Sequence, residues 1–321
     1  MTLFRALFNL LAPGGQRARL PILIFHRVLA RPDPLLDDVP DAESFERTMR
    51  WVGQWFNVLP LAEAAARLRR GDLPARALSI TFDDGYADNE EVAAPILRRL
   101  GLHATFFVAT GFLDGRNMWN DRVIEAMRAS AAQRLDLGFL GLGTVSLEAV
   151  AARRTAIDRI LTRIKHEKPE RRLALVERIE EACGARLQTA LMMRAEQVAR
   201  LAAGGMDVGA HTISHPILTR LSPAQAREEI VGSKAVLESI VGRRVSLFAY
   251  PNGVPMQDYG AEHVQMVRGA GFDAAVSTAW GVARPGADPL QLPRFTPWDR
   301  TRSRFALRLA QNMARSAYAT A

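Results

Sequence analysis

The chain has 321 residues, of which 48% are hydrophobic, so it can form one large α/β domain with an insertion or two ordinary domains, and disorder throughout is excluded. Its single cysteine, Cys183, excludes an internal disulfide and a metal site made of several cysteines. The formal net charge of +8 is uneven, because residues 1–31 and the segment after Asp299 carry arginines and no acid. Basic termini favour an anionic surface such as membrane lipid or an acidic polymer, with plain solubility as the alternative. Nucleic acid is disfavoured because no recognition motif accompanies the charge.

The first segment, residues 1–19, is predicted to be a basic amphipathic leader. Its apolar residues favour a short helix that ends at Pro13 and either rests on a membrane surface or packs on the domain. The apolar stretch is interrupted by Asn9 and followed by no cleavage motif, so it is unlike a signal peptide, and no run reaches the ~18 apolar residues of a membrane span. We therefore expect a cytoplasmic protein or one peripheral on the inner membrane. Residues 300–321 are predicted to form a basic C-terminal tail.

Between the termini, short apolar runs alternate with helical patterns. The runs that predict buried strands are residues 20–25, 77–82, 104–109, 206–210, 245–250 and 274–277. The helical patterns cover residues 41–56, 90–101, 194–203, 222–242 and 261–271. This alternation predicts a parallel sheet with crossover helices, and both a doubly wound sheet and a barrel satisfy it.

One long segment, from about residue 113 to 190, breaks this rhythm. It is predicted to be a mostly helical insertion within a domain that spans residues 20–299. The basic stretch from Arg153 to Arg172 is either a solvated helix face or a contact for an anionic polymer or lipid head group.

Four of the predicted strands end directly before polar or turn-forming residues: His26, Asp83, Asp84, His211, Pro251 and Asn252. His215 follows four residues after His211. The C-terminal ends of parallel strands share one face, and active sites are built there. We therefore expect these side chains to converge.

Two imidazoles and one carboxylate form a common ligand set for a catalytic divalent metal, with a position left for water. His211 and His215 supply the imidazoles, although a lone H-x-x-x-H is more often structural. Asp83 and Asp84 leave a strand in different directions, so one can bind metal while the other serves as a general base. The alternative is that Asp-Asp-Gly only makes a turn.

Taken together, the motifs TFDDGY (81–86), HTISH (211–215) and AYPNG (249–253) resemble the signature motifs of the polysaccharide deacetylase (NodB-homology) family. The resemblance covers about residues 20–112 and 191–297. It implies a distorted, TIM-like (β/α)7 barrel. It also implies metal-dependent removal of N-acetyl groups from the amino sugars of chitin, peptidoglycan, poly-N-acetylglucosamine or another exopolysaccharide.

Carried onto this sequence, the resemblance assigns the general base to Asp83 and the metal ligands to Asp84, His211 and His215. Zinc is the default metal for such ligands, and cobalt and nickel also accept them. The resemblance places the oxyanion contact and the substrate groove at Tyr86, Tyr250, Pro251 and Asn252, with the backbone N–H of Tyr86 holding the oxyanion.

The sequence departs from the family pattern at two points. No arginine precedes the AYP motif to orient the base, and we predict that Arg294 replaces it, with a surface ion pair as the alternative. No late Leu-x-x-His-type motif supplies the general acid. The histidines other than the two metal ligands are His26, His103, His166 and His263. Only His26 follows a buried apolar strand, in ILIFH, so we predict that it is the acid, with a structural histidine as the alternative. The chain then resembles the permuted, exopolysaccharide-associated members of the family.

The expected function is therefore metal-dependent N-deacetylation of a glycan in a polysaccharide. Two alternatives remain open at this point. The chain could remove a formyl or acetyl group from a lipid-linked sugar, or it could be a barrel that binds glycans without turning them over.

Overall fold

The computed structural model describes residues 3–184, 190–315 and 317–321, which divide into two compact units. Unit 1 consists of Met1–Arg31, Asp38–Asp114 and Met193–Ala321, and unit 2 of Pro32–Asp37 and Gly115–Met192. Among the helices of the described residues, none combines the length and hydrophobicity needed to cross a membrane.

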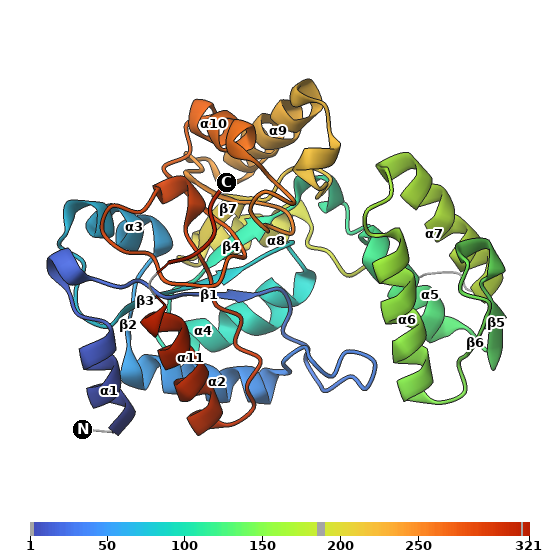
Figure 1. Ribbon diagram of the computed structural model, residues 1–321, viewed down its shortest axis with the longest axis horizontal. Coiled ribbons are helices and arrows are strands. Elements are labelled where there is room, and N and C mark those ends of the chain that lie inside the picture. Colours follow the sequence, from blue (N-terminus) through green and yellow to red (C-terminus); the bar gives the residue numbers. More distant parts are fainter. Residues whose placement is uncertain (1–2, 185–189, 316) are drawn as a thin grey trace. The chain divides into compact units, whose positions relative to one another are not determined.

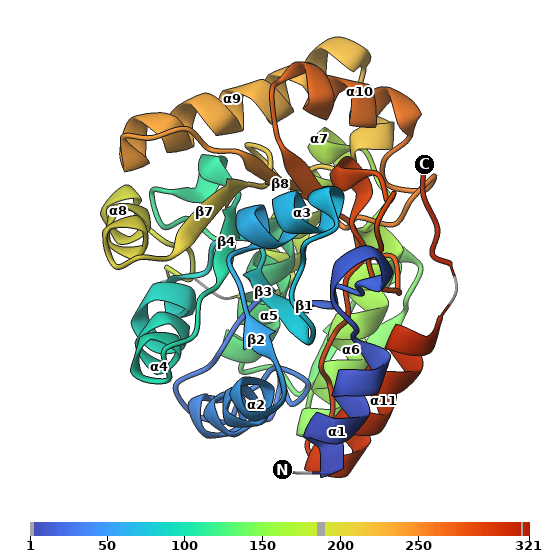
Figure 2. The ribbon, with the colours of Figure 1, turned by 90° about the vertical axis from the view of Figure 1, so that its left-hand side faces the viewer.

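Unit 1 is built on a parallel sheet of seven strands (Figures 1 and 2). The strands are β1 (Ile22–Phe25), β2 (Asn57–Val58), β3 (Ala77–Phe82), β4 (Thr105–Val108), β7 (Asp207–Ala210), β8 (Leu247–Ala249) and β9 (Ala274–Val276). Their order is β1-β3-β4-β7-β8-β9, and β2 pairs with β3. Leu292 bridges to Val276 of β9, and Phe295 bridges to Leu23 of β1, so one short segment joins both edges of the sheet. The predicted distorted barrel is confirmed.

Helices connect and surround these strands, as the alternation predicted. They are α2 (Ala42–Trp55), α3 (Leu61–Arg70), α4 (Ala94–Arg99), α8 (Ala195–Ala203), α9 (Pro223–Val241) and α10 (Ala261–Gly269). Their ends follow local chemistry. The Asp41 side chain accepts a hydrogen bond from the Ser44 N–H at the start of α2, and Ser222 forms a capping box with Gln225 at the start of α9. Gly242 ends α9 in the left-handed conformation, with φ of 66°.

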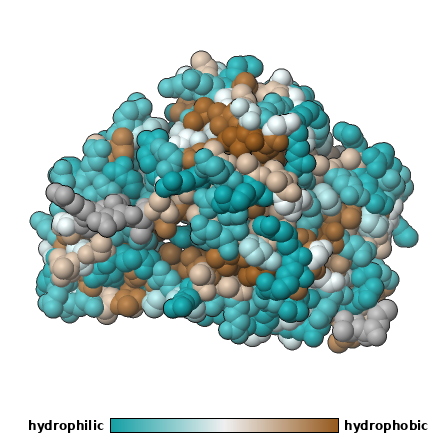
Figure 3. Space-filling model, turned by 180° about the vertical axis from the view of Figure 1, so that it is seen from behind, coloured by the Kyte–Doolittle hydropathy of each residue, from teal (hydrophilic) through white to brown (hydrophobic). Residues whose placement is uncertain are grey.

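Alternate residues of each strand face two different apolar layers. In β3, Leu78, Ile80 and Phe82 pack with the surrounding helices, whereas Ala77 joins the interior layer. Helix α3 contributes Leu61 and neighbouring residues to the interior layer. Ala62 of α3 lines one cavity together with Asp207 and Leu247, the first residues of β7 and β8, so α3 lies at the N-terminal ends of the strands and leaves their C-terminal ends for the site. On the face drawn in Figure 3, hydrophilic residues predominate and hydrophobic residues gather in patches.

The two ends of the chain form helices that lie side by side in unit 1 (Figures 1 and 2). Helix α1 (Leu3–Leu11) corresponds to the predicted amphipathic segment. Helix α11 (Arg302–Ala314) lies where we expected only a basic tail. It forms because Phe305, Leu309 and Met313 recur every four residues and are buried.

Unit 2 contains helices α5 (Trp119–Ala129), α6 (Val150–Ile164) and α7 (Pro169–Cys183) and an antiparallel pair, β5 (Arg134–Asp136) and β6 (Thr144–Ser146). It has its own hydrophobic core. Much of its basic stretch is used inside the unit. Arg153 donates to main-chain carbonyls, Arg154 pairs with Asp37, and Arg172 is buried over the ring of Trp119. This internal use favours a structural role for these arginines.

The short helical turns of the chain are η1 (Gly15–Arg17), η2 (Asn89–Ala93), η3 (Thr110–Phe112), η4 (Gly138–Leu140), η5 (Leu218–Arg220) and η6 (Pro289–Gln291).

Candidate active site

The C-terminal ends of β3 and β7 bring Asp83, Asp84, His211 and His215 together. Asp84 Oδ1 lies 3.4 Å from His211 Nε2 and 3.3 Å from His215 Nε2. Asp83 Oδ2 lies 4.0 Å from His211 Nε2. Residues from two distant stretches of the sequence therefore share one small volume, because parallel strands end on the same side.

The cluster of Asp84, His211 and His215 has the donor set of a divalent-cation site. One ligand atom from each of the three lies within 4.8 Å of the others. Asp84 Oδ1 is buried and accepts no hydrogen bond from the part of the chain that the structure describes. A buried carboxylate oxygen without a donor is costly unless a cation satisfies it. The three residues therefore fit a metal such as zinc, which binds imidazole and carboxylate ligands.

Hydrogen bonds outside the cluster orient the two imidazoles. His211 Nδ1 lies 2.7 Å from the carbonyl oxygen of Ala249 in β8. Because a carbonyl can only accept, Nδ1 carries the hydrogen, and in the neutral ring Nε2 presents a lone pair to the cluster. The backbone N–H of His215 donates to Thr212 Oγ1 at 3.2 Å.

The backbone around the cluster is held in an uncommon conformation. Asp84, Thr212 and His215 are non-glycine residues with positive φ, of 77°, 65° and 55°. Such residues store strain that the surrounding structure must compensate, and they concentrate at functional sites. Gly85 also has positive φ, of 90°, and a Cβ there would meet Val108 Cγ1 at 2.9 Å. The turn after β3 therefore requires glycine at this position.

Arg294 binds Asp83 through a buried bidentate ion pair. Its two terminal nitrogens donate to Asp83 Oδ1 and Oδ2, each at 2.7 Å. Its Nε donates to the carbonyl of Ser277 at 2.9 Å, and Nη1 also lies 3.2 Å from Thr81 Oγ1. The Arg294 side chain is 0% exposed, so the alternative of a surface ion pair does not hold.

The electrostatics of the cluster keep both aspartates ionised. Burial alone would raise the pKa of Asp83, but the charges of Arg294 and His211 hold it below its ordinary value. The pKa of Asp84 is likewise lowered against its burial, chiefly by His215. Burial lowers the pKa of His215 to about 4, so this ring is neutral near pH 7. Burial also opposes protonation of His211, but Asp83 and Asp84 outweigh it and raise its pKa. Asp83 and Asp84 therefore favour a positive charge at the position that His211 faces.

His26 lies where the sequence placed it, directly after β1. The side-chain amide of Asn89 donates to the backbone carbonyl of His26 at 2.8 Å. Its neighbour Arg27 pairs with Asp88 at 2.8 Å, and the Val28 N–H donates to the same carboxylate at 3.2 Å. Contacts at His26 and at the two residues after it thus fix this backbone to the segment that follows β3.

The side chain of His26 is exposed and within electrostatic reach of the cluster. Behind burial and the nearer charges, His26 also contributes to the lowered pKa of Asp83, Asp84 and His215. The alternation of β1, in which Leu23 and Phe25 face the outer layer, puts His26 on the other face. That is the face on which an acid could meet a substrate bound at the cluster.

Glu229 of α9 is a site residue that the sequence analysis missed. Its Oε2 accepts hydrogen bonds from the backbone N–H groups of Ile213 and Ser214, each at 2.8 Å, and its Oε1 accepts from Ser214 Oγ at 2.6 Å. It thereby holds the loop between His211 and His215. The sequence offers no local indication, because Glu228 beside it is the same residue type on an exposed position.

The other residues predicted for the oxyanion contact and the substrate groove differ in what their side chains contact. The ring of Tyr86 is buried, with the Arg27 guanidinium 4.7 Å from its centroid. Pro251 is buried, and the carbonyl of Asn252 accepts from Thr278 Oγ1 at 2.8 Å, so this loop is tied to the segment after β9. The side chain of Tyr250 does not line the predicted groove, because it is fully buried.

The Tyr250 ring faces the outer layer of the barrel. It is 0% exposed and stacks on Tyr259, with ring centroids 3.8 Å apart. The cause is alternation along this segment, where Phe248 and Tyr250 point outward while Leu247 and Ala249 point inward.

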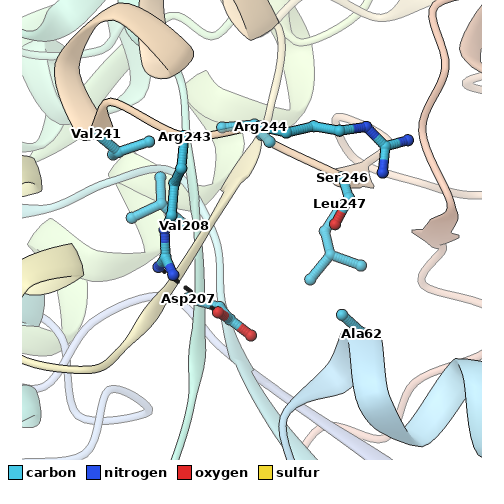
Figure 4. A pocket seen from close by; sticks show the side chains of 9 residues that line it. Ala62, Asp207, Val208, Val241, Arg243, Arg244, Ser246 and Leu247 are labelled. Carbon is cyan, nitrogen blue, oxygen red and sulfur yellow. Dashed lines mark ion pairs between the residues drawn. The ribbon is translucent and has the colours of Figure 1, made fainter.

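A separate cavity of about 160 Å³ lies at the opposite ends of the strands (Figure 4). Asp207 begins β7 and Leu247 begins β8, and both line this cavity. Arg243 points toward Asp207 across it and pairs with it at 3.8 Å. Since the metal-ligand cluster follows the other ends of these strands, the cavity does not belong to the candidate site.

Comparison with known proteins adds a family and a fold. Residues 70–137 and 158–275 match the family model described as polysaccharide deacetylase. The chain is 24% identical over 268 residues to YxkH of Bacillus subtilis, whose name places it among the polysaccharide deacetylases, and the match covers 83% of this chain and 67% of that protein.

Two solved structures share the architecture. Deacetylase PplD of Streptococcus pyogenes, solved in complex with acetate, is 19% identical with a TM-score of 0.62, over 93% of this chain and 100% of that chain. IcaB of Ammonifex degensii is 19% identical with a TM-score of 0.59, over 94% of this chain and 99% of that chain. At these identities the likeness establishes a shared fold.

Proposed function

This chain belongs to the polysaccharide deacetylase family, and we propose that it is a metal-dependent hydrolase that removes N-acetyl groups from the amino sugars of a polysaccharide. The observation that carries the proposal is that a candidate base and a candidate cation site lie together at one edge of the barrel. A buried carboxylate held ionised by Arg294 lies beside a three-residue cation site. Hydrolysis of an amide needs both a base for water and stabilisation of developing negative charge.

Asp83 is the general base of this proposal. Each carboxylate oxygen has about two lone-pair sites, so two remain after Arg294 has donated its two hydrogen bonds. Asp83 would accept a proton from the attacking water through one of them. Arg294 holds both carboxylate oxygens and so fixes the direction from which that proton arrives. It is a positioning residue.

Asp84, His211 and His215 would hold the metal. A divalent metal in such a site supplies Lewis-acid polarisation and a water that ionises more readily. Zinc suits one carboxylate and two imidazoles, and cobalt and nickel accept the same ligands. Asp84 would contribute its buried Oδ1, and His211 would contribute the nitrogen opposite its bond to Ala249.

His26 is the general acid of this proposal, and the backbone N–H of Tyr86 donates to the oxyanion. An expelled amine is a poor leaving group unless it is protonated, so a proton donor is required. His26 is anchored at its backbone by Asn89, exposed at its side chain, and within electrostatic reach of Asp83. The products would be acetate and a free amino sugar.

The substrate we propose is poly-N-acetylglucosamine, another exopolysaccharide or a cell-wall glycan. The relative from Streptococcus pyogenes is a deacetylase solved with acetate, which is the product that this reaction releases. The test is release of acetate and of free amine from a panel of N-acetylated polysaccharides, short oligosaccharides and a lipid-linked N-acetylated sugar. Equal amounts of both products from a polysaccharide would support the proposal. Release of acetate from the lipid-linked sugar alone would contradict it. So would binding of the glycans with no acetate released from any of them.

A further inference from the structure

Helix α1 presents two apolar faces, and unit 1 covers only one of them. On the covered face, Phe8 is 0% exposed and its ring lies 5.5 Å from that of Trp55 and 4.6 Å from that of Phe56. On the other face, Leu3 and Leu10 are 82% and 80% exposed, and Leu7 between them is 36% exposed. The spacing of these leucines, four and then three residues, makes one stripe along the helix.

The neighbouring helix α11 repeats this arrangement. It buries Phe305, Leu309 and Met313 against unit 1 and leaves Leu307 58% exposed. Helices α1 and α11 contact each other and lie side by side in both views of the ribbon (Figures 1 and 2). Each of two adjacent helices thus exposes large apolar side chains after its packing on the barrel is complete.

The two terminal segments carry charge of one sign. Arg5 in α1 and Arg304 in α11 are exposed, and Arg302 lies with its guanidinium 5.7 Å from the ring centroid of Phe4. Residues 1–31 and 300–321 contain no aspartate or glutamate. A protein partner of mixed charge would not require this one-sided arrangement. Exposed leucines among arginines complement a surface that is apolar below and anionic above, as an anionic bilayer is.

We propose that α1 and α11 form a peripheral membrane-binding surface for anionic phospholipid. The leucines of α1 enter the boundary between head groups and acyl chains, while Arg304, on the same side of α11 as Leu307, contacts lipid phosphates. This surface is independent of the catalytic residues, so it delivers the barrel to a membrane whatever glycan it acts on. Because the apolar and basic groups both contribute, binding requires anionic lipid and weakens as salt screens the arginines.

The test is co-sedimentation of the full chain with vesicles of phosphatidylcholine alone or mixed with phosphatidylglycerol, at low and high salt. We expect binding only to the mixed vesicles. Leu3→Ser with Leu10→Ser should weaken that binding about 100-fold, because two leucines no longer leave water. Arg304→Gln should weaken it about 5-fold and reduce its salt dependence.

Two matched controls lie on α9, away from this surface. Val231 and Val236 are 43% and 42% exposed, so Val231→Ser with Val236→Ser tests general loss of surface hydrophobicity. Arg227→Gln tests general loss of charge. Neither should change binding, and thermal unfolding should show that every variant is folded. The proposal is overturned if the wild-type chain does not bind the mixed vesicles. It is also overturned if the leucine variant binds them as strongly as the wild type does. A leucine variant that changes only self-association assigns the surface to a second copy of the chain and also overturns it.

Discussion

Replacing Asp83 by Asn should reveal how strongly the base and Arg294 depend on each other. The substitution keeps the side-chain shape and removes the charge that faces a guanidinium with 0% exposure. Arg294 then keeps the carbonyl of Ser277 and Thr81 Oγ1 as acceptors, at 2.9 and 3.2 Å, but no anion. Arg294→Met does the reverse and leaves Asp83 as a buried carboxylate without its cation.

The expected loss of stability is large for each single variant. Removing one partner of a buried ion pair costs about 3–5 kcal/mol, because the other charge stays desolvated. Removing both partners is often near neutral, so the double variant Asp83→Asn with Arg294→Met should lose less than either single variant. The coupling energy of the cycle should therefore reach about 2–3 kcal/mol or more.

The assay is denaturant unfolding of the four proteins with chelator in every sample, since bound metal would stabilise each variant differently. Asp273→Asn is the matched control, because it breaks the pair between Arg244 and Asp273, whose side chains are 56% and 55% exposed. That exposed pair should be worth about 1 kcal/mol or less. An additive cycle, or an Asp83→Asn variant no less stable than Asp273→Asn, would refute the reasoning. Acetate release should be lost in the double variant although its stability is regained.

Three further predictions follow from the site. A chelator should abolish acetate release, and Zn²⁺ or Co²⁺ should restore it; full activity in a sample verified to be free of metal would contradict the ligand assignment. His26→Ala should lower kcat about 10²–10⁴-fold at unchanged metal content and alter the limb of the pH–rate profile that reports the acid, whereas His166→Ala, an exposed histidine of unit 2, should do neither. Glu229→Gln should lower metal affinity about 10–100-fold, because the loop between His211 and His215 loses its charged acceptor. Glu228→Gln is its control, and equal metal affinity in both variants would show that Glu229 does not position the ligands.

The strands and the ends that carry chemistry could be predicted from the sequence because both depend on local patterns. Strand β3 is buried along its whole length and is mostly apolar in sequence, and Asp83 and Asp84 follow it directly. The convergence of His211 with Asp84 then follows from parallel topology alone, without knowledge of any side-chain position. The same reasoning placed His26 at this edge of the barrel.

What the sequence did not reveal depends on which side of an element a residue faces or on contacts far along the chain. Tyr250 belongs to the AYPNG motif, but its side chain lies on the outer face, and a shift of one residue along a strand reverses the side. The basic residues of the C-terminal segment obscured the buried stripe of α11. Glu229 is distinguished from Glu228 only by the loop it faces. Arg294 was predicted at a strand end, but its bidentate contact with Asp83 spans 211 positions and needs the closed barrel.

The central claim is that Asp83 and the cluster of Asp84, His211 and His215 divide the chemistry between base and metal site. Bound metal and acetate release should be measured on the same preparations of wild-type chain, Asp83→Asn and His215→Ala, each shown to be folded. The account predicts that wild-type chain has both metal and activity, that Asp83→Asn keeps the metal and loses most of the turnover, and that His215→Ala loses both. Equal loss of metal in the two variants, or substantial acetate release by Asp83→Asn, would contradict it.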